Sequence, residues 1–168
     1  MKLPLAISGA SGVGKSTTCA RVQSLVDSVV ALDCDIFWRR THLSEEETAQ
    51  AAAAWVRETF SAAKASNASA VVIAFHGNPF DEEPRYREPF QPFLITLQEE
   101  VEQFRSPVLV AHGDDHEFTV DQPLELANLT RLEVPGSPDV GWVRVTVTPS
   151  ARNPFAFENH VIPRWKYW

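Results

Sequence analysis

Apolar and polar residues in the first quarter of the chain follow a pattern that predicts a strand, a loop, a helix and a second strand. Leu3 to Ser8 is a short apolar run that ends at a glycine. From Lys15 to Asp27 apolar residues recur near helical spacing, and a further apolar run covers Ser28 to Asp33. This order of elements is typical of the opening of an α/β fold.

Two helices and two strands are predicted between residues 44 and 116. Ser44 and Glu47 form a capping box ahead of an alanine-rich helix. The run from Ala70 to Phe75 predicts a buried strand, and "PVLVAHGDDH" predicts another strand that runs into a polar loop. Between them Pro92 opens a helix. Its apolar stripe comprises Phe93, Leu94, Leu97, Val101 and Phe104.

The remaining segments are a long loop and an alternating tail. Residues 76–91 are rich in proline, charged and aromatic side chains, which predicts a loop of functional length. In the tail, "LTRLEV", "GWVRVTVT" and "PFAFE" alternate apolar and polar residues between turn signals, which predicts antiparallel strands. Trp142 lies in this alternation and is expected to belong to the core.

One stretch of the N-terminal segment indicates phosphate chemistry. It fits the pattern G-x-x-x-x-G-K-[ST] between a predicted strand and a predicted helix. Glycines permit turns that aim backbone N–H groups inward, and the helix N-terminus adds the positive end of its dipole. We expect Lys15 to neutralise the charge on the transferred phosphoryl group and Ser16 to ligate Mg²⁺. The nucleotide-binding residues are predicted to be Gly9, Ala10, Ser11, Gly12, Val13, Gly14, Lys15, Ser16 and Thr17.

Residues Pro4 to about Trp38 resemble the opening βαβ unit of P-loop nucleoside and small-molecule kinases. The family loop GxxGxGKST is matched by "GASGVGKST". The resemblance implies ATP binding with Mg²⁺, and a magnesium or substrate role for Asp33 or Asp35 at the end of the second strand. The alternative for these two residues is a pair of solvated turn acids. The family also uses an arginine-bearing lid, for which the sequence offers only Arg85 and Arg87.

Histidines and aspartates follow the later predicted strands. His76, His112 and His116 come directly after apolar runs, with Asp114 and Asp115 between the last two. Imidazole and carboxylate groups at the carboxyl ends of neighbouring strands are typical of metal sites in α/β enzymes. We expect these side chains to bind a metal ion. The alternative is a structural role for the histidines.

Residues from about Thr48 to Pro163 resemble the C-terminal half of a bacterial branch of calcineurin-like metallophosphoesterases. The resemblance implies a metal-binding histidine after an inner strand, matched by His76. It also implies a final GHxH-type loop, in which Asp114 stands where the family has its first histidine and His116 matches the second. The family motifs D-x-H, G-D-x-x-D and G-N-H-[DE] are absent from the sequence. A two-metal site therefore cannot be completed from the residues present. The resemblance implies one Mn²⁺, iron or Zn²⁺ ion bound by His76, Asp114 and His116, and the role of His112 stays open.

Composition narrows the range of partners. The chain is 44% hydrophobic and 22% charged, which is typical of a globular domain, and its net charge is −7. A negative chain argues against a broad nucleic-acid surface, and no apolar run approaches the roughly 20 residues that span a bilayer. Without a recognisable secretory signal, the expected location is the cytoplasm. The expected partner is a nucleotide or a small phosphate compound.

These patterns predict one domain over residues 1–168, with a P-loop βαβ unit over 1–40 and a phosphoesterase-like remainder over 41–168. The expected fold is a three-layer α/β sandwich with parallel N-terminal strands and antiparallel strands at the C-terminal edge. The expected function is binding of Mg·ATP with weak hydrolysis or kinase-like phosphoryl transfer. The alternatives are a metal-dependent phosphoesterase or its inactive remnant, and an inactive folded chimera. A kinase-like start joined to the second half of a phosphoesterase is typical of a gene fusion, a truncation or a chimera.

Overall fold

The computed structural model describes residues 44–138 and 140–162. The predicted elements before residue 44, and with them the phosphate-binding motif, lie outside the described residues. In chain order the described elements are α3 (Glu45–Ala65), β1 (Val71–Ala74), α4 (Pro84–Arg87), the 3-10 helix η1 (Glu88–Phe90), α5 (Gln91–Phe104), β2 (Val108–His112), β3 (Thr119–Asp121), β4 (Leu129–Glu133), β5 (Val140–Val147) and β6 (Phe155–Ile162).

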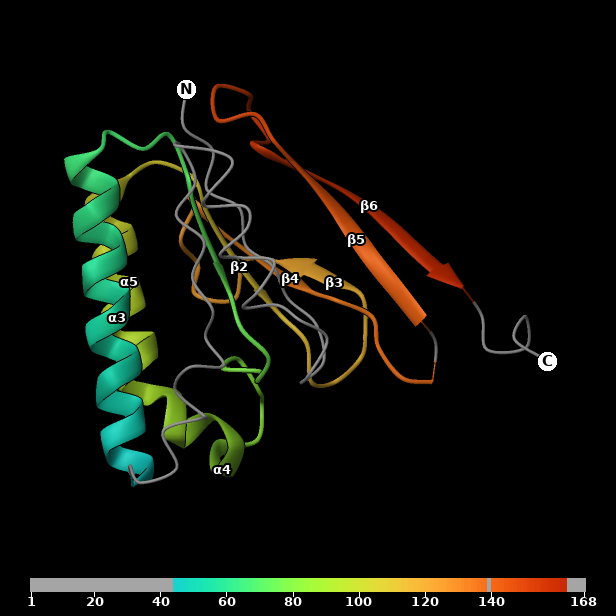
Figure 1. Cartoon of the computed structure of the whole chain (residues 1–168), viewed down its shortest axis with the longest axis horizontal. Helices are drawn as coiled ribbons and strands as arrows, with labels where there is room; N and C mark the ends of the chain where they lie inside the picture. The colour runs from blue at the N-terminus through green and yellow to red at the C-terminus, as the bar shows by residue number, and fades with distance from the viewer. Residues whose placement is uncertain (1–43, 139, 163–168) are drawn as a thin grey trace, which may run out of the picture.

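Four strands form a mixed sheet in the order β1-β2-β4-β3 (Figure 1). β1, β2 and β4 are parallel, and β3 runs antiparallel to β4. Val108 of β2 lies opposite both Val71 of β1 and Leu129 of β4, so the three parallel strands begin level with one another. The antiparallel pairing predicted for the alternating tail is present between β5 and β6, whereas β4 pairs with neither of them and lies between β2, which is parallel to it, and β3. The protein is therefore an α/β protein with parallel and antiparallel strands.

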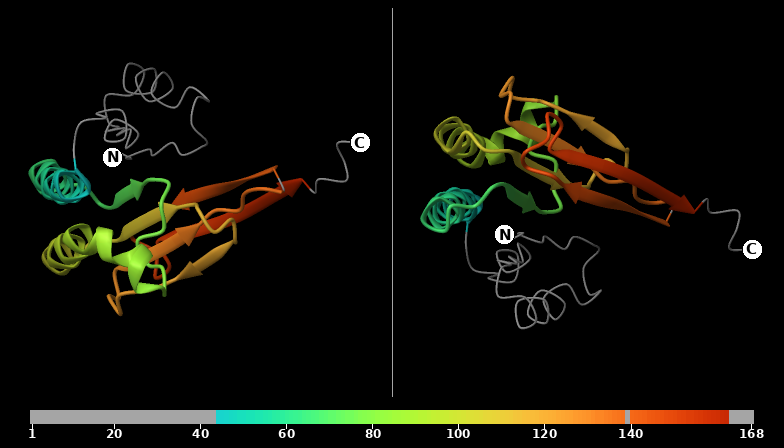
Figure 2. Two further views of the ribbon diagram at one scale, coloured as in Figure 1. Left: turned by 90° about the horizontal axis from the view of Figure 1, so that it is seen from below. Right: turned by 90° about the horizontal axis from the view of Figure 1, so that it is seen from above.

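Helices α3 and α5 lie together on one face of the sheet (Figure 2). The capping box at the start of α3 is confirmed: the Ser44 hydroxyl accepts from the Glu47 backbone N–H at 3.2 Å, and the Glu47 carboxylate accepts from the Ser44 N–H at 2.7 Å. Phe60 of α3 and Leu97 of α5 are completely buried against the sheet. The apolar stripe predicted for α5 is thus the face that packs into the core.

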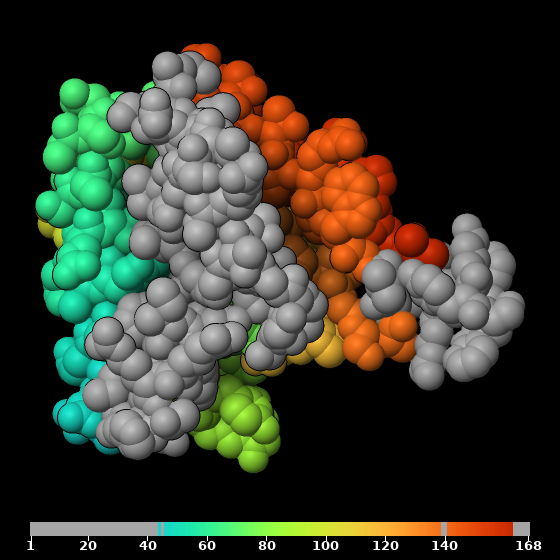
Figure 3. All heavy atoms as spheres, in the orientation of Figure 1, coloured from blue at the N-terminus to red at the C-terminus, as the bar shows by residue number. Residues whose placement is uncertain are grey.

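The hairpin of β5 and β6 is a separate two-stranded sheet and does not extend the first one, so this part of the prediction is wrong. Phe155 packs with Leu109 and Leu132 on the sheet face away from the helices. These contacts place the hairpin as a cover on that face, and its far end reaches beyond the body of the molecule (Figure 3). The odd-numbered residues of β5 point inward, and Trp142 therefore points outward and is half exposed. The prediction that Trp142 belongs to the core is therefore wrong.

The stretch predicted as a long loop contains α4 and η1, and the short strand β3 lies in a segment that showed no strand pattern. A methyl group at Gly77 would lie 3.0 Å from the Phe90 ring, so η1 packs closely against the loop after β1. Among the described helices none is both long and apolar enough to cross a bilayer.

Candidate functional site

Polar side chains gather at the edge where the three parallel strands end. His76 follows β1, the segment from Gly113 to His116 follows β2, and Glu133 is the last residue of β4. The two loops are joined directly, because the Gly113 N–H donates to the His76 carbonyl at 3.0 Å. Ligands of open parallel sheets bind at the carboxyl ends of the strands. The expected convergence of the histidine loops is therefore present.

Two of the three predicted metal ligands lie close together. His76 Nε2 is 3.7 Å from Asp114 Oδ1, and both side chains are more than half exposed. The His116 ring packs against Gly136 instead, where an added Cβ would lie only 2.5 Å from the ring. Asp114 and His116 both have left-handed backbone conformations, with φ of 89° and 67°. No three histidine, cysteine, aspartate or glutamate side chains within residues 44–138 and 140–162 are grouped to hold a metal ion as they stand.

A buried pair that sequence reasoning missed lies next to these loops. His112 and Glu133 are only 1% and 4% exposed, and they are direct partners in the register of β2 and β4. His112 Nδ1 is 2.9 Å from the Gly113 carbonyl oxygen, which can only accept, so Nδ1 carries the hydrogen and Nε2 carries a lone pair. Within the described part of the chain, neither His112 Nε2 nor Glu133 Oε1 has a hydrogen-bond partner.

Burial shifts both members of this pair toward their neutral forms. It lowers the pKa of the His112 imidazole, Arg131 lowers that pKa further, and the hydrogen bond to Gly113 opposes the shift. Burial raises the pKa of the Glu133 carboxyl, and the negative charge of Asp115 adds to that effect. The edge of the sheet therefore holds an imidazole and a carboxyl group in surroundings that disfavour isolated charge.

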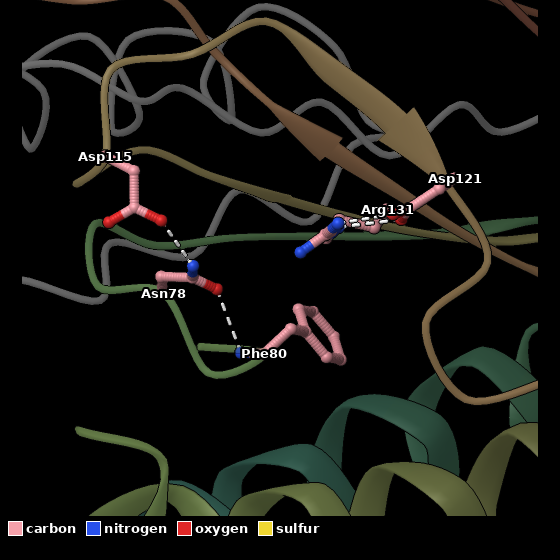
Figure 4. A network of polar contacts seen from close by, with 5 residues as sticks. All are labelled: Asn78, Phe80, Asp115, Asp121 and Arg131. Carbon is pink, nitrogen blue, oxygen red and sulfur yellow. Dashed lines mark hydrogen bonds and ion pairs between the residues drawn. The ribbon is translucent and has the colours of Figure 1, made fainter. Parts of the chain in front are cut away.

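Polar contacts join the loops after β1 and β2, and an ion pair joins β3 to β4 (Figure 4). The Asn78 amide donates to Asp115 Oδ2 at 2.6 Å and accepts from the Phe80 N–H at 2.9 Å. Arg131 forms a bidentate ion pair with Asp121, with Nε 2.7 Å from one carboxylate oxygen and an NH2 group on the other. The guanidinium carbon lies 5.6 Å from the centroid of the Phe80 ring. Asn78 thus holds the loops after β1 and β2 together.

Of the other predicted site residues, the two arginines lie in the described part of the chain and the N-terminal residues do not. Arg85 and Arg87, the candidate lid arginines, belong to α4, and Arg85 pairs with Glu83 at 2.8 Å. Both side chains are exposed to solvent. The predicted nucleotide loop, including Lys15, and the two acids Asp33 and Asp35 lie outside the described residues.

In comparisons with known proteins, no family model, no curated protein and no solved structure matches the chain. The features of the chain that bear on function are therefore the motif of residues 9–17 and the polar edge of the sheet.

Proposed function

We propose that the chain binds a nucleoside triphosphate with Mg²⁺ on the loop Gly9–Thr17. The observation that carries the proposal is the sequence of that loop, in which the fixed glycines are followed by Lys15 and Ser16 between a predicted strand and helix. The described α/β sheet supports it, since loops of this kind belong to parallel-sheet proteins. The natural partner is ATP or another small phosphate compound.

The same proposal extends to the fold of the whole chain. The first 40 residues form a βαβ unit that adds parallel strands and a covering helix to the described sheet, and the whole chain becomes a three-layer sandwich. The described sheet leaves room for this arrangement, because β1 is an edge strand among the described strands. Strands of a βαβ unit run parallel, as β1, β2 and β4 do.

Each residue of the loop has a defined task. The Lys15 ammonium neutralises charge that grows on the transferred phosphoryl group, and Ser16 holds Mg²⁺ together with Asp33 or Asp35. The described residues supply no evident general base or acceptor pocket for phosphoryl transfer. We therefore expect the chain to hydrolyse the bound nucleoside triphosphate only slowly.

Calorimetric titration of the full chain with Mg·ATP tests the proposal. The parent protein should bind one equivalent, and Lys15→Ala should lower the affinity by at least about tenfold, because the charge facing the phosphates is removed. His116→Ala, which changes a residue far along the chain from the loop, should bind as the parent does. Absence of binding in the parent would refute the proposal and leave an inactive chimera as the remaining description.

A second candidate function is metal-dependent cleavage of phosphate esters, or an inactive remnant of that activity. The close approach of His76 and Asp114 at the carboxyl edge favours it. With Mn²⁺ added, hydrolysis of an aryl phosphodiester by the parent should be slow and should fall to background in His76→Ala. Equal rates in parent and variant, with Arg57→Ala on the exposed surface as control, would exclude His76 from any such site.

A further inference from the structure

The pair His112 and Glu133 presents two buried acceptors side by side. Both side chains point to the helix-covered face of the sheet, because they continue the alternation of Val108 with Val110 and of Leu129 with Arg131. His112 Nε2 carries a lone pair because Nδ1 donates to Gly113. Glu133 Oε1 also carries lone pairs and has no hydrogen-bond partner among the described residues. Buried polar atoms in folded proteins are nearly always satisfied, so these two call for a partner.

The chemistry of the pair favours a cation or a hydrogen-bond donor over an anion. Two lone pairs repel an anion such as phosphate and attract a metal ion or a hydrogen-bond donor. The His112 imidazole already has the arrangement found in metal-binding histidines, whose second ring nitrogen usually donates to a backbone carbonyl or a carboxylate. Arg131, a cationic side chain of the described part of the chain that acts on the pair, is already neutralised by its ion pair with Asp121.

We propose that His112 Nε2 and Glu133 Oε1 bind one divalent transition-metal ion of the Zn²⁺ class, with Asp115 as the third protein ligand. A nitrogen and carboxylate oxygens are ligands that Zn²⁺ accepts readily. Asp115 acts electrostatically on both members of the pair, but its carboxylate accepts from Asn78. The strand register sets His112 beside Glu133, and Asp115 completes the site when its side chain leaves Asn78.

This metal site is independent of the nucleotide-binding proposal and uses none of the candidate ligands His76, Asp114 and His116. Its two buried ligands are the last residues of β2 and β4, and only Asp115 comes from the loop that also contains Asp114 and His116. Success or failure here therefore leaves the Mg·ATP titration of Lys15→Ala unaffected.

Zn²⁺ titration of the chelator-treated full chain, followed by calorimetry, tests the site. The parent should bind one Zn²⁺ per chain. Glu133→Gln and His112→Asn should each weaken binding by at least the roughly 10–100-fold that loss of a metal site's outer-shell partner costs. Asn is chosen at position 112 because its amide can still donate to Gly113 while the Nε2 lone pair is lost. Glu117→Gln is the matched control, because it removes the same negative charge at an exposed position in the neighbouring loop. This variant should bind Zn²⁺ as the parent does.

The parent protein alone provides a second readout if a variant does not fold. In a long-range ¹H–¹⁵N spectrum the His112 ring should show the Nδ1–H form, and Zn²⁺ should shift its Nε2 resonance most among the five histidines. An unchanged His112 resonance would overturn the proposal. So would Zn²⁺ binding that survives Glu133→Gln and His112→Asn but disappears in His76→Ala or His116→Ala, since that result locates the metal in the loops.

Discussion

At the scale of single residues, Ser44 has the clearest energetic role. Its hydroxyl and backbone N–H both exchange hydrogen bonds with Glu47, which satisfies N–H groups that the first turn of α3 would otherwise leave free. Ser44→Ala should therefore lower the free energy of unfolding by about 1 kcal/mol, measured by urea denaturation. Ser61→Ala, an exposed change of the same type within α3, should not lower it, because alanine favours the helix interior. Equal losses in the two variants would contradict the capping role.

The capping box also shows what short-range patterns reveal. Ser44 and Glu47 are three positions apart, so their interaction follows from the sequence alone once a helix is assumed. His112 and Glu133 are 21 positions apart in the sequence, and they meet because β2 and β4 pair directly. The sequence does show that His112 shares the alternation of Val108 and Val110, and this was the available signal for its burial. The identity of its neighbour depends on strand order, which no local pattern contains.

At the scale of elements, α5 shows how one face of a helix determines its contribution to stability. Leu97 is completely buried against α3 and the sheet, whereas Ile95 on the same helix is 55% exposed. Leu97→Ala should lower the free energy of unfolding by about 2–5 kcal/mol, because the cavity cannot close fully. Ile95→Ala should change it by less than about 1 kcal/mol, since its side chain already contacts water. Urea denaturation of both variants measures the difference, and similar losses would contradict the observed orientation of α5.

Strong periodicity made α3, β1, α5 and β2 predictable, whereas the elements with weak or ambiguous patterns were not. β3 has three residues with no pronounced alternation, so its strand conformation depends on pairing with β4. The alternation of β5 was clear, but alternation does not reveal which sheet a strand joins or which face meets the core. Trp142 was misplaced for that reason: the inner face of the hairpin belongs to Val143, Val145 and Val147, and Trp142 stacks on His160 at 4.0 Å between ring centroids.

At the scale of the whole molecule, the mixed sheet separates two apolar clusters. Leu129 and Leu132 of β4 illustrate this, because the first packs with the helices and the second with Phe155 of the hairpin. The hydrophobic pattern predicted an α/β protein, and the described residues confirm that class. The separate hairpin sheet was not predicted, because a strand has the same alternating pattern whether it extends a sheet or packs across its face.

The position of β4 has a consequence for the order in which the protein is assembled during synthesis. β3 leaves the ribosome before β4, yet in the described sheet β3 pairs only with β4. β4 also pairs with β2, on the side opposite β1. β1 and β2 can pair as they emerge, but β3 cannot join the sheet in sequence order. At translation rates of about 5–20 residues per second, β3 must wait on the order of a second for residues 129–133 to emerge. When β4 emerges, it pairs with β2 on one side and with β3 on the other, and the same pairing with β2 brings Glu133 beside His112.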